Sequence, residues 1–185
     1  MFTRILLVVL AVLVVGSGAS YLWTRVSPHE PRTEIEIDAP VDEVWAVLTD
    51  LDAYADWNPF IVSAAGEIEV GARLTNTLKD DGSSTVFTPE VLVADEAKEL
   101  RWIGRFWVPG IVDGEHYFEL EAIDGGRTRL VQGETFTGVL VPFAGSALDV
   151  EDDFAAMNEA LKARVEAGSA TRAESGAAAA VEARS

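Results

Sequence analysis

The stretch TEIEIDAPVDEVWAVLTDLDAYADWNPFI, residues 33–61, contains the change of hydrophobic period that decides the fold. Residues 33–38 alternate strictly between apolar and polar side chains, which predicts a half-buried strand. Pro40 suits the first turn of a helix, and from Val41 to Leu48 apolar residues recur at i, i+3, i+4 and i+7. The sequence therefore predicts a strand that is followed directly by an amphipathic helix.

A second short helix follows the first. Leu51, Tyr54 and Trp57 have helical spacing. Asn58-Pro59 comes next, and the residue before a proline is disfavoured in the helical region of backbone space. We therefore expect this helix to end at Asn58.

Beyond residue 60 the period shortens, and apolar runs alternate with turn signals. These signals are Gly71, Asp81-Gly82, Pro109-Gly110, Asp113-Gly114 and Asp124-Gly125-Gly126. They predict strands near 61–68, 72–79, 85–94, 99–107, 115–123 and 128–137. From Leu148 to Val165 helical spacing returns, with acidic residues at the start and basic residues near the end, as the helix dipole favours.

This order of elements predicts an α+β fold. An antiparallel sheet with one apolar face needs a cover, and a single long amphipathic helix is present to supply it. We expect a curved sheet of about seven strands wrapped around the C-terminal helix, within a domain at residues 33–167. A linker at 26–32 contains Pro28 and Pro31 and predicts an extended spacer. The small and polar composition of 168–185 predicts a disordered tail, although its alanine run favours partial helix.

The N-terminal 25 residues contain an apolar segment. Ile5 to Trp23 carries no charge and, as a helix, extends roughly 28 Å, close to the thickness of a bilayer's hydrocarbon core. Arg4 and Arg25 flank it, and Tyr21 lies with Trp23 where an interfacial aromatic belt is expected. These features predict an uncleaved, single-pass membrane anchor.

Two questions about this segment stay open in the sequence. The alternative to an anchor is a cleavable signal peptide with an apolar region at Ile5–Val15 and small residues at 17–20. The flanking arginines slightly favour a cytoplasmic domain. A short N-terminal tail before an apolar run is typical of an export signal, and on this ground we expect the domain on the extracytoplasmic side.

Composition excludes several classes of function. The chain has a net charge of −17 and no cysteine. The first 32 residues carry three Arg and one Glu, and the last 18 carry two of each, so the region between them carries −19. Such a surface repels nucleic-acid phosphates and anionic headgroups, so we expect no nucleic-acid partner and only apolar contact with a membrane. The acidic run Asp149–Asp153 lacks the pattern of a calcium loop and suits a helix start, so no metal or cofactor is expected.

The opening stretch, the segment GEHYFELE at 114–121 and the closing DDFAAMNEALKARVE at 152–166 resemble the SRPBCC superfamily. This superfamily comprises helix-grip proteins such as Bet v 1-like proteins, START domains and polyketide cyclases. The resemblance covers residues 33–166, with Ala39-Pro40 to Trp45 and Trp57-Asn58-Pro59 as its most specific parts. It implies a cavity for apolar small molecules between the sheet and the C-terminal helix. It does not imply one activity, because a fold hosts many functions.

Aromatic residues support a cavity independently of that resemblance. Leu100, Trp102 and Phe106 share one strand face with Gly104, whose missing side chain leaves room. The competing interpretation is an ordinary packed core, because aromatic residues fill cores equally well. The lining that we expect comprises Trp57, Phe60, Leu100, Trp102, Phe106, Phe118, Phe136, Phe143, Phe154 and Met157.

Two expected loops, at 106–112 and 138–148, are apolar where polar residues are usual. They could frame the mouth of a cavity, contact a bilayer, or pack against each other. The sequence does not decide among these roles.

His116 is the candidate general base of the domain, with Glu134 as its candidate carboxylate partner. Whether the two face each other depends on the length of the turn at 124–126, because a one-residue change reverses the faces of a strand. A hydrogen-bonded structural histidine is the competing interpretation. No G-x-S-x-G motif is present, so a serine hydrolase is not expected.

Three hypotheses of function result. The first is a membrane-tethered binding protein that holds a lipid-like or polycyclic molecule and is not an enzyme. The second is a cyclase or dehydratase that uses His116 with a carboxylate. The third is a structural or chaperone module without a ligand.

Overall fold

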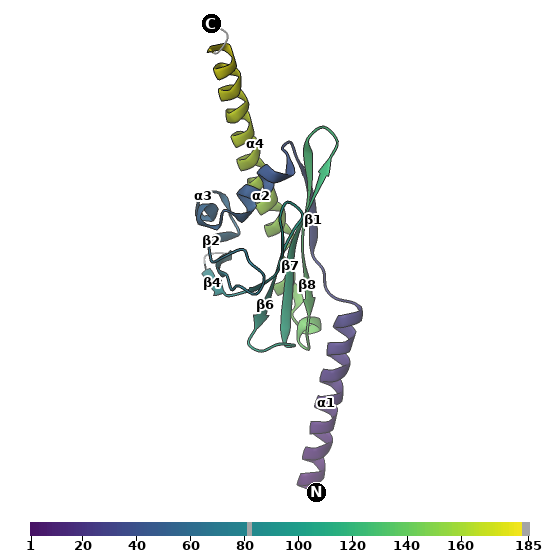
Figure 1. The fold of residues 1–185 in the computed structure, drawn as a ribbon. Coiled ribbons are helices and arrows are strands. Elements are labelled where there is room, and N and C mark those ends of the chain that lie inside the picture. The colour runs from purple at the N-terminus through teal and green to yellow at the C-terminus, as the bar shows by residue number, and fades with distance from the viewer. Residues whose placement is uncertain (81–82, 183–185) are drawn as a thin grey trace.

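The computed structural model describes residues 1–80 and 83–182, and Figure 1 shows an α+β domain with a helix projecting from each end. The Asp81-Gly82 turn and the last three residues of the expected tail lie outside the described residues. The α-helices are α1 (Phe2–Val26), α2 (Val41–Thr49), α3 (Tyr54–Trp57) and α4 (Glu151–Glu182), and the short 3-10 helices are η1 (Leu51–Ala53), η2 (Val141–Phe143) and η3 (Gly145–Leu148). The strands are β1 (Arg32–Ile37), β2 (Ile61–Ala65), β3 (Thr75–Asp80), β4 (Ser83–Phe87), β5 (Glu90–Asp95), β6 (Glu99–Phe106), β7 (Val112–Ile123) and β8 (Arg127–Thr137).

The N-terminal part of the domain forms the expected strand and two short helices. Pro40 is the N-cap of α2, and Asp42 and Glu43 lie in its first turn, near the positive end of the dipole. The Tyr54 hydroxyl donates to the Leu48 carbonyl at 2.7 Å and so ties α3 to α2. After α3, the Asn58 side chain accepts hydrogen bonds from the backbone amides of residues 60 and 61 and turns the chain into β2.

The strands form a five-stranded antiparallel sheet in the order β1-β8-β7-β6-β5 and a three-stranded sheet in the order β2-β3-β4. Backbone hydrogen bonds join the two sheets, because the amide of Gly71 donates to Val91 and that of Leu74 donates to Pro89. The single strand that the sequence predicts at 85–94 is wrong: it is two strands, β4 and β5, separated at Thr88-Pro89. Proline has no N–H for a sheet ladder, which explains the interruption. The expected turn at Asp113-Gly114 is also wrong, because both residues belong to β7.

Helix α4 covers the concave face of the larger sheet. Phe154, Met157, Leu161 and Val165 recur at helical spacing, and all four side chains are buried. These residues join the sheet and α2 in one core cluster. The predicted cover helix is therefore present and supplies the apolar layer that the sheet requires.

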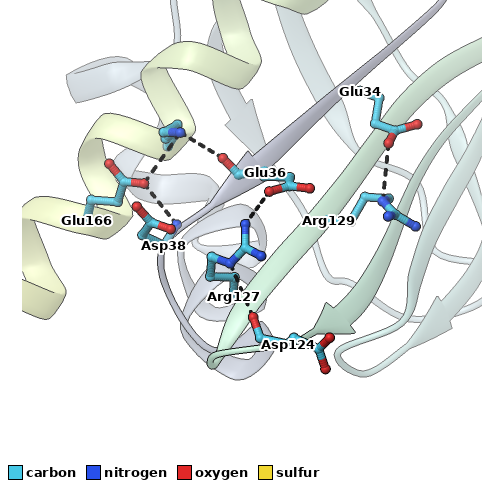
Figure 2. Close-up of polar contacts among 8 residues, drawn as sticks. Glu34, Glu36, Asp38, Asp124, Arg127, Arg129 and Glu166 are labelled. Atoms are coloured by element: carbon cyan, nitrogen blue, oxygen red, sulfur yellow. Dashed lines mark hydrogen bonds and ion pairs between the residues drawn. The ribbon is translucent and has the colours of Figure 1, made fainter.

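Polar contacts fasten α4 to the edge strand β1, as Figure 2 shows. The Lys162 ammonium donates to the Glu36 carbonyl at 2.8 Å, and the Glu166 carboxylate accepts from the Asp38 amide at 2.9 Å. On the other side of β1, Arg127 pairs with Glu36. These contacts fix the position of the helix along the strand.

Helix α4 continues to Glu182, beyond the boundary at 167 that the sequence indicates. The sequence predicts a disordered tail with partial helix in its alanine run, and the structure continues the helix through this run for a local reason. Alanine has the highest helix propensity of all residues. In addition, Arg172 forms an ion pair with Glu43 of α2 at 2.7 Å, which holds the first turns of the extension against the domain.

Helix α1 is long and apolar enough to span a membrane, and the apolar window in its sequence has no buried residue. A signal sequence would pass the same test. Its last turns contact the domain: the Ser20 hydroxyl donates to the Val139 carbonyl at 2.7 Å, and Thr24 is buried against Gly138. The following linker pairs with β8, since the amide of Phe136 donates to the His29 carbonyl. Helix α1 therefore leaves the domain at the end where it contacts β8 and η2 and projects away from the sheet (Figure 1).

Candidate functional site

The β7–β8 turn determines whether the candidate residues share a face. Ile123 pairs with Arg127, so the turn comprises Asp124, Gly125 and Gly126. With this register His116 lies directly opposite Glu134. Residues that are directly opposite in an antiparallel pair project from the same side of the sheet, here the side that faces α4.

A cavity of about 250 Å³ lies between this side of the sheet and the start of α4. Its lining is mainly apolar and comes from the residue before β2, from β2, β3, β4, β6, β7, β8 and η3, and from the residue before α4. The lining residues are Phe60, Ile61, Leu78, Phe87, Trp102, Gly104, Arg105, Phe106, Val112, Gly114, His116, Glu134, Phe136, Ala147, Leu148 and Val150. Phe106 and Ala147 are exposed, whereas Trp102 and His116 are buried, so the cavity runs inward from the first pair to the second.

His116 and Glu134 form the polar inner end of this cavity. The His116 ring is only 3% exposed and stacks on Trp102, with 4.9 Å between ring centroids and 11° between ring planes. The ring of Phe154 contacts it edge-on at 4.9 Å. His116 Nδ1 lies 3.4 Å from a Glu134 carboxylate oxygen, so a protonated ring would form an ion pair with this carboxylate.

The second ring nitrogen of His116 also has a partner. Gln132 Nε2 lies 3.2 Å from His116 Nε2, and the Gln132 side chain is fully buried. If Gln132 donates there, the neutral ring accepts at Nε2 and donates from Nδ1 to Glu134, which satisfies both nitrogens. The amide oxygen of Gln132 then has no hydrogen-bond partner.

Gly114 makes room for the carboxylate. A Cβ at this buried position would overlap the Glu134 side chain. Glycine therefore allows Glu134 to lie flat along β7 beside His116 rather than turn away to solvent. The two residues can accept and donate a proton at one point inside an apolar cavity, which is the arrangement that general acid–base chemistry requires.

The structure brings together six of the residues that the sequence singles out. Phe60, Trp102, Phe106, Phe136, His116 and Glu134 line the cavity. Leu100, Phe118, Phe154 and Met157 do not line it and are fully buried in the core. Leu100 and Phe118 lie on the same strand faces as Trp102 and His116 but farther toward the end where α4 is in close contact.

The two other expected lining residues also lie outside the cavity wall. Trp57 is half-buried and packs beside the core cluster. Phe143 is 78% exposed on η2. Alternation along a strand identifies a face but not the depth at which that face becomes hollow.

Several lining residues and one partner of the site, Gln132, were not predicted from the sequence. Most of the missed positions are aliphatic or small and lie on β2, β3, β7 and η3, where no pattern separates lining from core. The sequence could have indicated Gln132, because it is a polar residue at an inward position of a strand, between Leu130 and Glu134. Within the ranges 1–80 and 83–182, no group of three or more His, Asp or Glu side chains could hold a metal ion.

Comparison with known proteins agrees with this architecture. The family model described as "Polyketide cyclase / dehydrase and lipid transport" matches residues 28–166. No curated protein sequence matches the chain significantly.

Solved structures share the fold at low sequence identity. The Zhui aromatase/cyclase from Streptomyces sp. R1128 is 20% identical, with a TM-score of 0.61 over 75% of this chain and 94% of its own. A START superfamily protein from Mycobacterium smegmatis is also 20% identical, with a TM-score of 0.55 over 75% and 97%. A protein from Thermus thermophilus is again 20% identical, with a TM-score of 0.60 over 76% and 99%. The antiparallel sheet, the gripped helix and the family match over most of the domain together show that this chain belongs to the polyketide cyclase/dehydrase and lipid transport family of the SRPBCC superfamily.

Proposed function

We propose that this chain is a membrane-tethered binding protein for a compact apolar small molecule, lipid-like or polycyclic, held between the sheet and α4. The observation that carries the proposal is the cavity itself, because apolar side chains surround it while it remains unfilled. Ligand pockets typically enclose roughly 300–1,000 Å³. At about 250 Å³, this cavity suits a compact ligand, or one end of a longer ligand whose remainder lies at the mouth.

Burial of apolar surface would supply the affinity. Each buried CH₂ contributes roughly 0.8 kcal/mol, so a ligand that buries about ten carbons gains about 8 kcal/mol before the costs of ordering. Among the described lining residues, Arg105 contributes a guanidinium group near the surface and Glu134 contributes a carboxylate beside His116. A hydroxyl or carbonyl group at the inner end of the ligand would find hydrogen-bond partners at His116 and Glu134.

Gly104 allows a sharp test of the cavity. It lies in the lining, and a Cβ at this position would meet Phe87 at 3.6 Å, an ordinary contact. Gly104→Ala should therefore be tolerated, whereas the four-carbon side chain of Gly104→Leu should occupy the space of the ligand. The two variants form a matched pair.

The experiment is native mass spectrometry of the full chain after extraction in mild detergent. We expect the unmodified chain and Gly104→Ala to carry a co-purified apolar species and Gly104→Leu to lack it. Equal occupancy in all three proteins, or a bare mass in all three after incubation with a total lipid extract, would contradict the proposal.

The contacts of α1 support retention of the anchor. Ser20 and Thr24 hydrogen-bond to the loop at 138–139, and Thr24 is 2% exposed. Cleavage near the small residues at 17–20 would remove part of this interface. We propose that the domain lies on the extracytoplasmic side, as the short tail before the apolar run indicates. Protease protection of a tag placed after Ser185 tests this orientation, and digestion only after lysis of the cell would contradict it.

A second function, proton transfer on a bound polyketide-like substrate, is favoured by one observation. His116 and Glu134 are 3.4 Å apart and both line the cavity. Positioned acid–base pairs contribute typically 10²–10⁴-fold to rate. With a β-polyketone thioester analogue as the substrate, Glu134→Gln should lower turnover by about that factor while binding persists. Unchanged turnover in Glu134→Gln would remove this candidate.

A further inference from the structure

The two apolar loops of the sequence lie at one end of the domain, beside the end of α1. The amide of Val139 donates to the Gly110 carbonyl, and the amide of Leu140 donates to Ile111, so the loops are joined through their backbones. Gly138 permits this approach, because a Cβ there would overlap the backbone of Ile111. These two backbone hydrogen bonds hold the loops together without using their side chains.

Those side chains are large, apolar and exposed. Phe106, Trp107, Val108, Leu140 and Phe143, here called the apolar rim, are between 41% and 78% exposed. Neither loop contains a charged residue between 106 and 112 or between 138 and 148. Exposed apolar side chains on two joined loops of a protein of this charge mark a site of contact with an apolar partner.

The conformation of Trp107 strengthens this interpretation. Its φ angle is +66°, in the left-handed region that bulky residues rarely adopt, and its ring is 78% exposed. Its ring stacks on that of Phe106, itself an exposed residue of the rim, so packing in the core does not account for tryptophan at this position. Strained residues of this kind cluster where function requires them.

The position of α1 indicates what the apolar rim contacts. Ser20 bonds to Val139, and the Tyr21 ring lies against Gly110, so both loops are level with the last turns of an apolar helix. On the N-terminal side of Ser20 the helix is exposed on all sides. A helix that enters a bilayer at this level brings the rim to the same interface, where tryptophan and other aromatic rings are favoured.

The cavity also opens at this level. Phe106 belongs both to the rim and to the cavity lining, and Leu148 at the end of the second loop lines the cavity. Leu148 also lines a groove of about 360 Å³ between η2 and the end of α1, where Trp23 and Val141 form part of the wall. The Leu148 region therefore separates the groove beside the membrane helix from the ligand cavity.

We propose that the apolar rim inserts into the leaflet that α1 enters, so that the cavity opens toward lipid and takes its ligand from the bilayer. The passage of ligand rests on the proposed function, whereas contact of the rim with lipid does not. Because the two loops are uncharged and the domain is strongly acidic, insertion should occur in neutral phosphatidylcholine and should not increase with anionic lipid.

The absence of cysteine makes a direct test possible. Single cysteines replace Trp107, Phe143, Leu22 and Val70 in turn, each carrying an environment-sensitive fluorophore, and the full chain is placed in phosphatidylcholine nanodiscs. Leu22 on α1 is the positive control. Val70 is the matched negative control, because it is 69% exposed and lies outside both loops. The quencher is phosphatidylcholine with a nitroxide on its acyl chain.

We expect the nitroxide lipid to quench the labels at positions 107, 143 and 22 about twofold or more and to leave the label at 70 unchanged. Quenching at 22 alone would overturn the proposal. A lack of quenching at 22 as well would overturn both the rim and the tether. Labels at 107 and 143 that are shielded from lipid to a degree set by the number of chains per disc would show that a second copy covers the rim, which also overturns it.

A separate measurement distinguishes failure of the rim from failure of the proposed function. The double variant Trp107→Ser, Phe143→Ser changes two exposed side chains that do not line the cavity, so the fold should persist. In detergent, native mass spectrometry should still find its apolar ligand. In phosphatidylcholine nanodiscs, its rate of uptake of the neutral probe N-phenyl-1-naphthylamine should fall about tenfold. An unchanged rate with ligand still bound would overturn the rim and leave the cavity function standing.

Discussion

The two ends of the interface between the sheet and α4 use the same elements and differ in what fills them. At the closed end, Ile37, Leu130, Leu161 and Val165 are at most 1% exposed and form a dense core. At the open end, Leu148 and Val150 face Trp102 and the neighbouring strands across a cavity. Stability and binding are therefore separated along one C-terminal segment, in which η3 and Val150 border the cavity and α4 packs the core. A cavity lowers stability, because the side chains around it lack dispersion contacts on one side. Tight packing at the closed end compensates for this loss at the open end.

Truncation of the same residue type at the two ends gives the largest expected contrast. Leu161→Ala removes a fully buried side chain from the closed end and should cost about 2–5 kcal/mol in unfolding free energy. Leu148→Ala removes a half-buried lining residue and should cost about 1 kcal/mol or less. Denaturant unfolding of the full chain in detergent measures both. Equal losses would show that the open end is packed as tightly as the closed end.

A buried hydroxyl in the core cluster tests its packing through the pH dependence of stability. Burial, with a smaller effect of Asp50, raises the pKa of Tyr54 well above its ordinary value. Its contribution to stability is therefore complete below about pH 10 and is lost as pH rises beyond that value. Tyr54→Phe leaves the Leu48 carbonyl unpaired and should cost about 1–3 kcal/mol at neutral pH.

The stability of the same variant should fall less steeply with pH above about 10. Tyr117 provides the control, because burial and its hydrogen bond to Glu30 raise its pKa to about 12. Tyr117→Phe should flatten the profile over a narrower range of pH, since the folded Tyr117 itself titrates near pH 12. A Tyr54→Phe profile parallel to that of the unmodified chain would contradict the assignment.

One substitution at the open end should raise the stability of the protein instead of lowering it. Trp107→Gly releases a left-handed conformation that costs a bulky residue roughly 1–2 kcal/mol. The greater flexibility of glycine in the unfolded chain offsets part of this gain. We therefore expect a small increase in thermal stability in detergent together with weaker contact of the rim with lipid. A loss of stability would mean that the stack of Trp107 on Phe106 contributes more than the strained backbone costs.

The smallest effect is expected for the polar fastening of Figure 2. Lys162 and Glu166 are both about one-third exposed and 3.7 Å apart. Exposed pairs of this spacing contribute about 0.3–0.5 kcal/mol, so Lys162→Met should change the unfolding free energy by less than about 1 kcal/mol. The change should shrink further in high salt. A loss similar to that of Leu161→Ala would show that α4 depends on this edge rather than on its apolar face.

Much of the fold follows from local sequence, and the site follows only in part. Residues 33–61 predict β1, α2 and the turn at Asn58-Pro59 because hydrophobic period, proline and helix dipole agree there. The spacing from Leu148 to Val165 likewise predicts the gripped part of α4. The break at Pro89 was not predicted, because an apolar run hides a strand boundary. For the extension of α4 to Glu182 the sequence indicates only partial helix, because small residues have little hydrophobic pattern.

The site illustrates where local reasoning stops. The sequence identifies His116 and Glu134 as candidates, but their pairing depends on the three-residue turn at 124–126, which no local rule fixes. It also groups Phe118 with Trp102, although only Trp102 of the two reaches the cavity. The depth at which α4 separates from the sheet is a property of tertiary packing.

Photolabelling with benzophenone, a compact neutral aromatic ketone, tests the central claim most directly. The full chain in phosphatidylcholine nanodiscs is irradiated with the probe, and labelled peptides are mapped by mass spectrometry. We predict labelling at the cavity residues Phe60, Trp102 and Phe106, retention of this labelling in Gly104→Ala, and its loss in Gly104→Leu. Labelling confined to α1, or cavity labelling that is unchanged in Gly104→Leu, would contradict a ligand site between the sheet and α4.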